Sequence, residues 1–255
     1  MRKLRFSLLA AALALAACLP LKADVPGLSV FAAASLSESL QDIASLWSKA
    51  GNAPVSYNFH ASGSLARQIL EGAPADVFVT ADEASMDQLQ SAGLLEPGSR
   101  VSLLSNALVV VVRVDSPMEV SSAADLMGLS RLAIGDPSAV PVGTYAKAWL
   151  AKLGLWDKAI DKAVPCDNVR AVLAAVESGN VDAGIVYRTD ALISKKVKVA
   201  FEVPPEQAPK ISYPLAVLKS AADKQEALRF DKFLQGPEAA KVFKARGFIL
   251  MKPAE

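Results

Sequence analysis

Cysteine and histidine are scarce in this chain. Its 255 residues include two cysteines, Cys18 and Cys166, and one histidine, His60. Two cysteines cannot build the disulfide framework of a small secreted domain, and one histidine cannot supply a histidine-rich metal site. Both of these classes are therefore excluded, and stability must come from an ordinary hydrophobic core.

An excess of charge of either sign is also missing. The chain has 27 Lys and Arg against 26 Asp and Glu, so its formal net charge is +1, and no nucleic-acid partner is expected. Hydrophobic residues make up 52% of the sequence, which is too apolar for a disordered chain. The length is sufficient for one large core or two modest ones.

The N-terminus has the pattern of a secretory signal peptide. Met1–Arg5 is basic, and Phe6–Cys18 is an apolar run, interrupted only by Ser7, that is too short to span a bilayer. We expect cleavage after residue 23 and a soluble periplasmic product with Cys166 as its only thiol. Leu15–Cys18 also resembles a lipobox, which leaves a form anchored through an acylated Cys18 as the alternative.

Apolar strand-like runs alternate with amphipathic segments in the rest of the chain. Leu28–Ala32 precedes a helix-like segment over Leu36–Ala50, and Asp76–Thr80 precedes another over Glu83–Ala92. This alternation predicts an α/β fold with mixed, mostly parallel sheets flanked by helices. Two lobes would have to be joined by strands, because no Gly/Ser-rich spacer is present. Ala107–Arg113 and Tyr213–Leu218 are the predicted crossover segments.

Four predicted helix starts carry small or polar residues. Ser35 stands three positions before Glu38, which is capping-box spacing; Ser62, Pro141–Val142 and Asn168–Val169 precede the other three helices. Backbone N–H groups at a helix start lack intrahelical partners and carry the positive end of the helix dipole, so they can bind an anion. Every helix needs a cap, however, and spacing alone does not bring these four starts together.

Seven blocks of the sequence, in order, resemble the periplasmic molybdate-binding proteins of ABC importers. They are Val30–Leu36, Ala61–Ile69, Gly72–Phe78, Gly135–Pro137, Val140–Ala146, Gly184–Tyr187 and Gly236–Ala240. The resemblance implies a type II periplasmic binding fold with the ligand held between two lobes. Lobe one would comprise residues 25–106 plus 215–255, and lobe two residues 107–214.

The resemblance also implies a set of ligand-binding residues. Ser35 and Ser62 would each provide a hydroxyl and a backbone N–H, Val142 and Val169 backbone N–H groups, and Tyr187 its phenol hydroxyl. Molybdenum would be bound only as the molybdate oxyanion, with tungstate as a second ligand and no cofactor. The implied partners are a membrane permease and its cytoplasmic ATPase, and we expect a monomer.

The chemistry of these five positions fits a fully ionised oxyanion. Molybdate offers only acceptors, and hydroxyls and helix-start amides can all donate. None of the five is a carboxylate, which counts against monoprotonated phosphate, whereas a sulfate-type oxyanion remains an alternative ligand. Val142 departs from the alanine common in relatives. Cys166 beside the fourth helix start is interpreted as a small buried hydrophobe, with a reactive thiol as the alternative.

A secreted α/β enzyme is the competing class. His60 lies two residues before Ser62, but the chain has no G-x-S-x-G elbow, no glycine-rich nucleotide motif and no H-E-x-x-H motif. We therefore interpret His60 as a packed or solvent-facing residue and expect no catalysis. Arg67 and Arg170 lie just inside helix starts, where a solvated side chain is the usual outcome.

Overall fold

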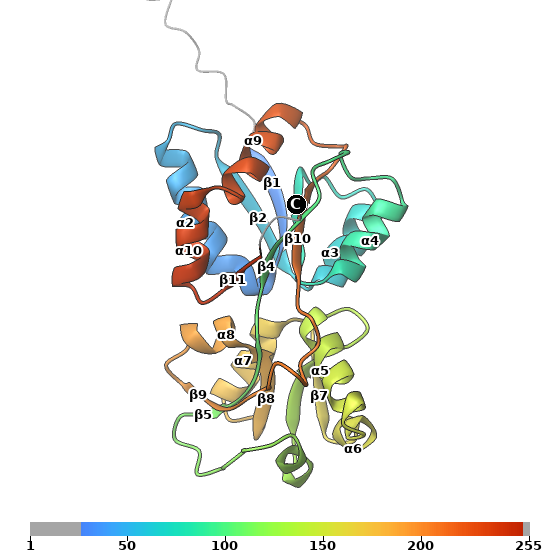
Figure 1. Cartoon of the computed structure of the whole chain (residues 1–255), viewed down its shortest axis with the longest axis vertical. Helices are drawn as coiled ribbons and strands as arrows, with labels where there is room; N and C mark the ends of the chain where they lie inside the picture. The colour runs from blue at the N-terminus through green and yellow to red at the C-terminus, as the bar shows by residue number, and fades with distance from the viewer. Residues whose placement is uncertain (1–26, 252–255) are drawn as a thin grey trace, which may run out of the picture.

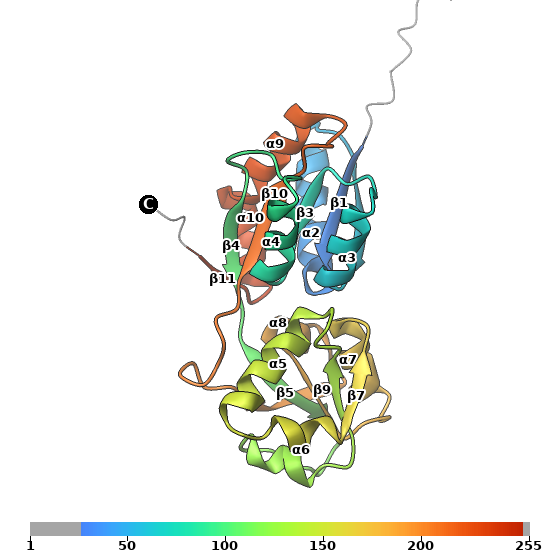
Figure 2. The ribbon, with the colours of Figure 1, turned by 90° about the vertical axis from the view of Figure 1, so that its right-hand side faces the viewer.

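The structure is a computed structural model that describes residues 27–251. The expected signal peptide and Cys18 lie outside these described residues. Two α/β lobes are stacked along the long axis of the molecule, and two segments of the chain run between them (Figures 1 and 2). The predicted two-lobed architecture of mixed sheets flanked by helices is thus confirmed. The prediction that these sheets are mostly parallel was wrong, because five of the nine strand pairs of the described residues are antiparallel.

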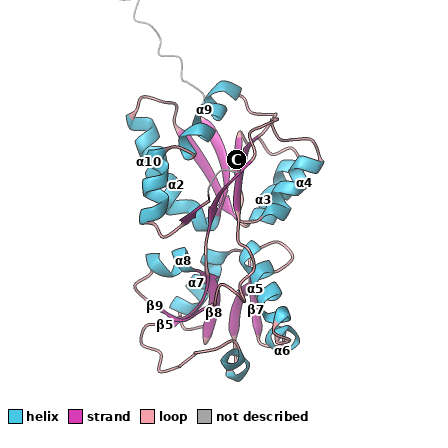
Figure 3. Cartoon of the chain, in the orientation of Figure 1, coloured by secondary structure: helices cyan, strands magenta, loops and turns pink. Residues whose placement is uncertain are grey.

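Lobe one contains a six-stranded sheet with helices on both faces (Figure 3). Its strands are β1 (Leu28–Ala33), β2 (Val55–His60), β3 (Val77–Val79), β4 (Val101–Ser105), β10 (Tyr213–Val217) and β11 (Ile249–Leu250). Its helical elements are the short 3-10 helix η1 (Ala34–Leu36), α2 (Ser37–Lys49), α3 (Ser62–Leu70), α4 (Glu83–Ser91), α9 (Lys224–Leu234) and α10 (Pro237–Ala245). The strand order is β11-β4-β10-β3-β1-β2, in which β1 pairs parallel with β2 and β3 and the other pairs are antiparallel.

Lobe two contains a five-stranded sheet. Its strands are β5 (Leu108–Arg113), β6 (Leu132–Gly135), β7 (Ala163–Cys166), β8 (Ala183–Tyr187) and β9 (Val197–Glu202). Its helical elements are η2 (Ala124–Gly128), α5 (Pro141–Lys152), α6 (Trp156–Ile160), α7 (Val169–Glu177) and α8 (Arg188–Ile193). The order is β7-β6-β8-β5-β9; β6 pairs parallel with β7 and β8, while β5 pairs antiparallel with β8 and β9.

Alternating side chains of β1 explain why lobe one has helices on both faces. Val30 and Ala32 belong to the same buried cluster as Ile43 of α2. Phe31 points to the opposite face and packs in a second buried cluster with Leu65 of α3. Successive side chains of a strand point to opposite faces, so one apolar strand can hold two helix layers.

The chain passes between the lobes after β4 and again after β9. The predicted crossovers Ala107–Arg113 and Tyr213–Leu218 were wrong in detail, because most of each forms β5 or β10 inside one sheet. Their apolar character reflects burial on both faces, and the passages themselves are residues 106–107 and 203–212. From these strand memberships we propose a first lobe boundary at 106/107, as expected, and a second at 212/213, two residues before the expected 214/215.

Candidate functional site

A pocket lies between the lobes where helix starts from both of them meet. It has a volume of about 210 Å³, including the part open to solvent. Lobe one contributes the end of β1 and the residues around the α3 start, and lobe two contributes the starts of α5 and α7 and the end of β8. The lining residues are Ala33, Ala34, His60, Ala61, Ser62, Val140, Pro141, Val142, Asn168, Val169 and Tyr187.

Four of the five residues predicted for the site line this pocket. They are Ser62, Val142, Val169 and Tyr187. Ser35 lies beside the lining and is 4% exposed, and its neighbours Ala33 and Ala34 take its place at the pocket wall. The fold therefore gathers the predicted residues at one place, while their roles toward a ligand stay a prediction.

Ser35 sits in the 3-10 helix η1 and makes no capping box. Neither η1 nor α2 has a side-chain cap, so the capping role expected from the Ser35–Glu38 spacing was wrong. The Ser35 hydroxyl instead lies 3.3 Å from the Tyr213 hydroxyl. Asn106 donates one amide hydrogen to Tyr213 at 3.2 Å and the other to Thr189 at 2.9 Å. Because Tyr213 accepts from Asn106, its own hydrogen can go to Ser35, which leaves the Ser35 hydrogen available to donate.

The Ser62 hydroxyl is oriented by the backbone of lobe one. Its oxygen accepts the N–H of Ala81 at 2.9 Å, and the residue is fully buried as the first residue of α3. One lone pair is thereby occupied while the hydroxyl hydrogen can be donated toward the pocket. Ser62 is thus held in the donor orientation that an anion requires.

Tyr187 brings an unpartnered hydroxyl to the same pocket. The residue is 1% exposed, and its buried hydroxyl has no hydrogen-bond partner among the described residues. Its ring lies between those of Tyr145 and Tyr213, at centroid distances of 6.5 and 5.8 Å. Burial raises the pKa of the Tyr187 hydroxyl well above its ordinary value. The group stays protonated, and a buried donor without a partner indicates a missing acceptor.

Three of the four helix starts at the pocket lack a side-chain cap, as do α6 and α10 elsewhere in the described residues. Away from the pocket, α4 and α9 are capped by the carboxylates of Asp82 and Asp223. At the pocket, η1, α3 and α5 have no side-chain cap, and none of η1, α3, α5 and α7 has an acidic residue in its first turn. The α3 and α5 starts therefore have no side chain accepting from their first amides, and no carboxylate in the first turn of α3, α5 or α7 offsets the positive dipole end of the helix.

The α5 and α7 starts each leave a particular amide available. In α7 the Asn168 side chain accepts from the amides of Arg170 and Ala171, at 2.9 and 3.1 Å, and not from that of Val169. In α5 Pro141 has no N–H, so Val142 carries the first amide of the helix. A Cβ on Gly143 would lie 1.9 Å from the carbonyl oxygen of Gly135, so only glycine lets the α5 start pack this closely on β6.

The pocket lining contains no Asp, Glu, Lys or Arg. An acceptor-only anion would therefore meet hydroxyl and amide donors without a competing carboxylate. No cluster of His, Cys, Asp and Glu suited to a metal ion occurs in the described part of the chain. Cys166 is half-buried and outside the lining, and burial together with Asp167 raises the pKa of its thiol.

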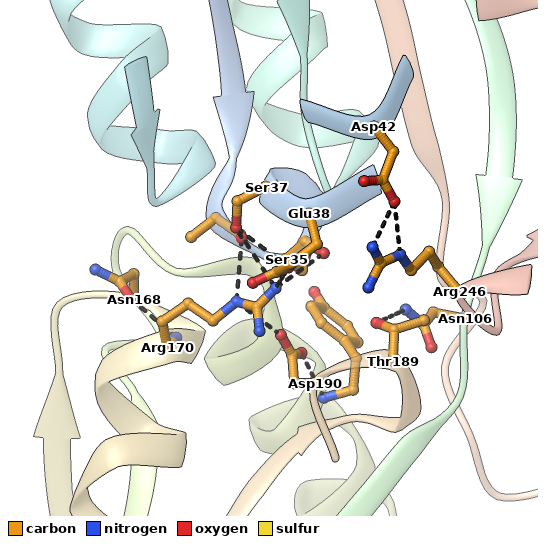
Figure 4. A network of polar contacts seen from close by, with 12 residues as sticks. Ser35, Ser37, Glu38, Asp42, Asn106, Asn168, Arg170, Thr189, Asp190 and Arg246 are labelled. Carbon is orange, nitrogen blue, oxygen red and sulfur yellow. Dashed lines mark hydrogen bonds and ion pairs between the residues drawn. The ribbon is translucent and has the colours of Figure 1, made fainter. Parts of the chain in front are cut away.

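Two residues, His60 and Arg170, lie at or beside the pocket in positions that the sequence did not predict. His60 lines the pocket, and its buried Nδ1 has no hydrogen-bond partner within residues 27–251. Arg170 was expected to be solvated, but its side chain is only 21% exposed and reaches from lobe two to lobe one (Figure 4). Arg67 does lie at an exposed position, where it donates to Ser64. In the sequence, the one signal for a role of Arg170 is its position just inside a predicted helix start.

Two lobes, each a mixed sheet flanked by helices, with a donor-lined pocket between them are typical of a solute-binding protein. The family model for bacterial extracellular solute-binding proteins matches residues 28–249 of the sequence. The chain therefore belongs to this family. In the described part of the chain, no helix is both long and apolar enough to cross a membrane.

Several relatives resemble the chain over most of its length. The molybdate-binding protein ModA of Escherichia coli is 41% identical over 234 residues, which cover 89% of this chain and 91% of that protein. The periplasmic molybdate-binding protein of Azotobacter vinelandii has a similar structure, with a TM-score of 0.80 and 28% identity over 88% of this chain and all of that one. The substrate-binding domain of a molybdenum ABC transporter from Clostridium difficile gives a TM-score of 0.69 and 35% identity, over 89% of this chain and 99% of that one.

Proposed function

We propose that this protein binds molybdate and delivers it to an ABC transporter. One observation carries the proposal: uncapped helix starts and the unpartnered Tyr187 hydroxyl meet in a pocket whose lining contains no Asp, Glu, Lys or Arg. Molybdate is a tetrahedral dianion near neutral pH, so every oxygen requires donors. The names of the relatives with the same fold and up to 41% identity point to the same ligand.

We assign the donors as the sequence predicted them. Ser35 and Ser62 provide hydroxyls and backbone N–H groups, Val142 and Val169 provide helix-start amides, and Tyr187 provides its phenol hydroxyl. For Ser35 this requires the hydroxyl beside the lining to turn toward the ligand when it binds. Tungstate has the same charge and shape and nearly the same size, so we propose that it binds as well.

The rest of the proposal concerns the setting of the protein. It works without a cofactor and without catalysis, as a periplasmic monomer whose partners are a membrane permease and its ATPase. Removal of residues 1–23 would give the soluble form, and acylation of Cys18 would give an anchored one. Both N-terminal features lie outside the described residues.

A thermal-shift series on the chain from residue 24 onward tests this function. Molybdate, tungstate, sulfate and phosphate are each added to the wild type and to Tyr187→Phe. Ligand at 100 times its dissociation constant should stabilise the wild type by about 2.7 kcal/mol, or roughly 5–10 °C.

We expect shifts with molybdate and tungstate in the wild type and smaller shifts in Tyr187→Phe, which lacks one donor. A sulfate shift of equal size would make the protein a general sulfate-type oxyanion binder. The absence of any shift would contradict oxyanion binding at this pocket and revive the enzyme alternative.

A further inference from the structure

Arg170 is the second residue of α7 in lobe two, and its guanidinium lies against the first helical turn of lobe one (Figure 4). Its Nε donates to the carbonyl oxygen of Ala34 at 3.2 Å, and its Nη2 donates to that of Ser35 at 3.5 Å. The same Nη2 also contacts the Ser37 hydroxyl at 3.5 Å and pairs with the Glu38 carboxylate. The Arg170 side chain of lobe two thus contacts four residues within the segment Ala34–Glu38 of lobe one.

Within lobe two, Arg170 forms an ion pair with a buried carboxylate. The carboxylate of Asp190, on α8, is fully buried and lies 3.3 Å from the Arg170 Nε. The other carboxylate oxygen of Asp190 accepts the backbone N–H of Tyr187 at 3.2 Å. Arg170 is therefore linked through Asp190 to a residue that lines the pocket, although Arg170 does not line the pocket itself.

These contacts join two elements that carry the proposed ligand donors. The residue before Arg170 is Val169, which lines the pocket. The carbonyls that Arg170 binds belong to Ala34 and Ser35 of η1. When the lobes separate, all four contacts to lobe one must break together. A ligand that binds only between closed lobes has an apparent affinity that depends on the stability of the closed form.

We propose that Arg170 is a positioning residue that stabilises the closed form of the two lobes and thereby sets the affinity and the release rate of the oxyanion. The proposal rests on the proposed function of the pocket. Arginine suits this task because its planar fork of donors can serve a carboxylate and carbonyls at once, which a lysine ammonium cannot do in a fixed geometry.

Arg246 offers a matched control. It forms an arginine–carboxylate pair with Asp42, but both residues belong to lobe one: Arg246 is the C-cap residue of α10, and Asp42 is on α2. The pair does not cross between the lobes. Arg246 lines the same groove between the lobes as Arg170, so its replacement removes a positive charge and an arginine–carboxylate pair at the same place while leaving the contacts of Arg170 with lobe one intact.

The experiment measures molybdate binding by calorimetry and molybdate release by stopped flow for four proteins. They are the wild type, Arg170→Gln, Arg170→Lys and Arg246→Gln. We expect Arg170→Gln to raise the dissociation constant about 10-fold or more, mainly through faster release, and Arg170→Lys to recover part of the loss. Arg246→Gln should change it less than about 2-fold.

Small-angle scattering of the same ligand-free proteins gives a readout that does not need the ligand. We expect a larger radius of gyration for Arg170→Gln than for Arg246→Gln. Unchanged affinity and release in Arg170→Gln would overturn the proposal while the proposed function stands. If the wild type binds no molybdate, the proposed function fails, and the radius of gyration then decides: an increase supports the closing role of Arg170, and no change overturns it.

Discussion

The two sides of the pocket are closed by different kinds of contact. On one side the α3 start meets the loop before α5, where the Gly63 N–H of lobe one donates to the Ala139 carbonyl of lobe two at 3.1 Å. We call this contact the backbone seam. On the other side Arg170 of lobe two binds the η1 segment and Glu38 of lobe one, and we call this contact the arginine seam.

The two seams depend on different properties of the chain. The backbone seam requires only that no side chain stands between two main chains, and a Cβ on Gly63 would lie 2.7 Å from the Ala139 oxygen. The arginine seam requires charge and a long side chain, and it buries the Asp190 carboxylate. The first seam should therefore be sensitive to one added methyl group, and the second to charge and pH.

The largest expected effect comes from Ser62, the neighbour of Gly63 at the α3 start. Ser62→Ala removes a donor to a charged ligand and leaves the Ala81 N–H without its acceptor. A hydrogen bond to a charged group contributes about 1.5–3 kcal/mol, so we expect the dissociation constant for molybdate to rise about 10- to 100-fold in calorimetry.

Ser64→Ala is the control for this prediction, because Ser64 lies on the same helix turn but outside the pocket lining. It should bind as the wild type does. Wild-type affinity in Ser62→Ala would show that the Ser62 hydroxyl does not bind the ligand.

Gly63→Ala tests the backbone seam without removing any donor to the ligand. Gly63 lies inside α3, where alanine is favoured over glycine by about 0.5–1 kcal/mol, so the ligand-free protein should become slightly more stable. The new methyl group should nevertheless hinder closure and raise the dissociation constant about 10-fold.

Gly128→Ala is the matched control, since a Cβ there would meet nothing within 4 Å. Calorimetry and thermal unfolding of both variants separate closure from folding. Unchanged binding by Gly63→Ala would mean that the bound lobes do not approach this closely.

Asp190→Asn tests the charge buried behind the arginine seam. Burial raises the pKa of Asp190 to about 6, while the Arg170 guanidinium opposes the shift. Since the folded protein holds this proton more tightly than the unfolded chain does, the carboxyl makes wild-type stability fall as the pH rises from about 4 to about 6.

The asparagine variant lacks this titration. Relative to the wild type, its free energy of unfolding should therefore be higher at pH 8 than at pH 4, by up to about 2 kcal/mol. Chemical denaturation at the two pH values measures the difference. A constant difference would show that the Asp190 carboxyl does not titrate in this range.

The smallest effect is expected at Val169. Only its backbone amide is assigned to the ligand, so Val169→Ala should change the dissociation constant less than about 2-fold. The residue is 4% exposed, and the lost methyl groups should lower the melting temperature measurably. A 10-fold loss of affinity would mean that the valine side chain shapes the pocket as well.

The sequence predicted the architecture better than the contacts between the lobes. Periodic apolar segments and turn residues are local, so the alternation of strands and helices and the helix starts at Ser62, Pro141 and Val169 could be predicted. The family resemblance, rather than spacing, indicated that these starts converge. Four of the five residues it implied line the pocket.

The failures concern residues whose partners lie far away in the sequence. Glu38 was expected to cap its own helix, yet it pairs with Arg170, 132 residues further on. Ser35 faces Tyr213 across 178 residues of sequence. No local pattern distinguishes such side chains from solvated or capping ones, because the competing partner comes close only once distant segments of the chain have folded together.

The uncapped helix starts have a consequence for the protein before it meets its ligand. Each of α3 and α5 begins without a side chain to satisfy its first amides, which costs stability at both helices. A single bound oxyanion would serve as the shared cap of several helices from both lobes. The ligand is then a structural component of the loaded protein, and amide hydrogen exchange in those first turns should slow when it binds.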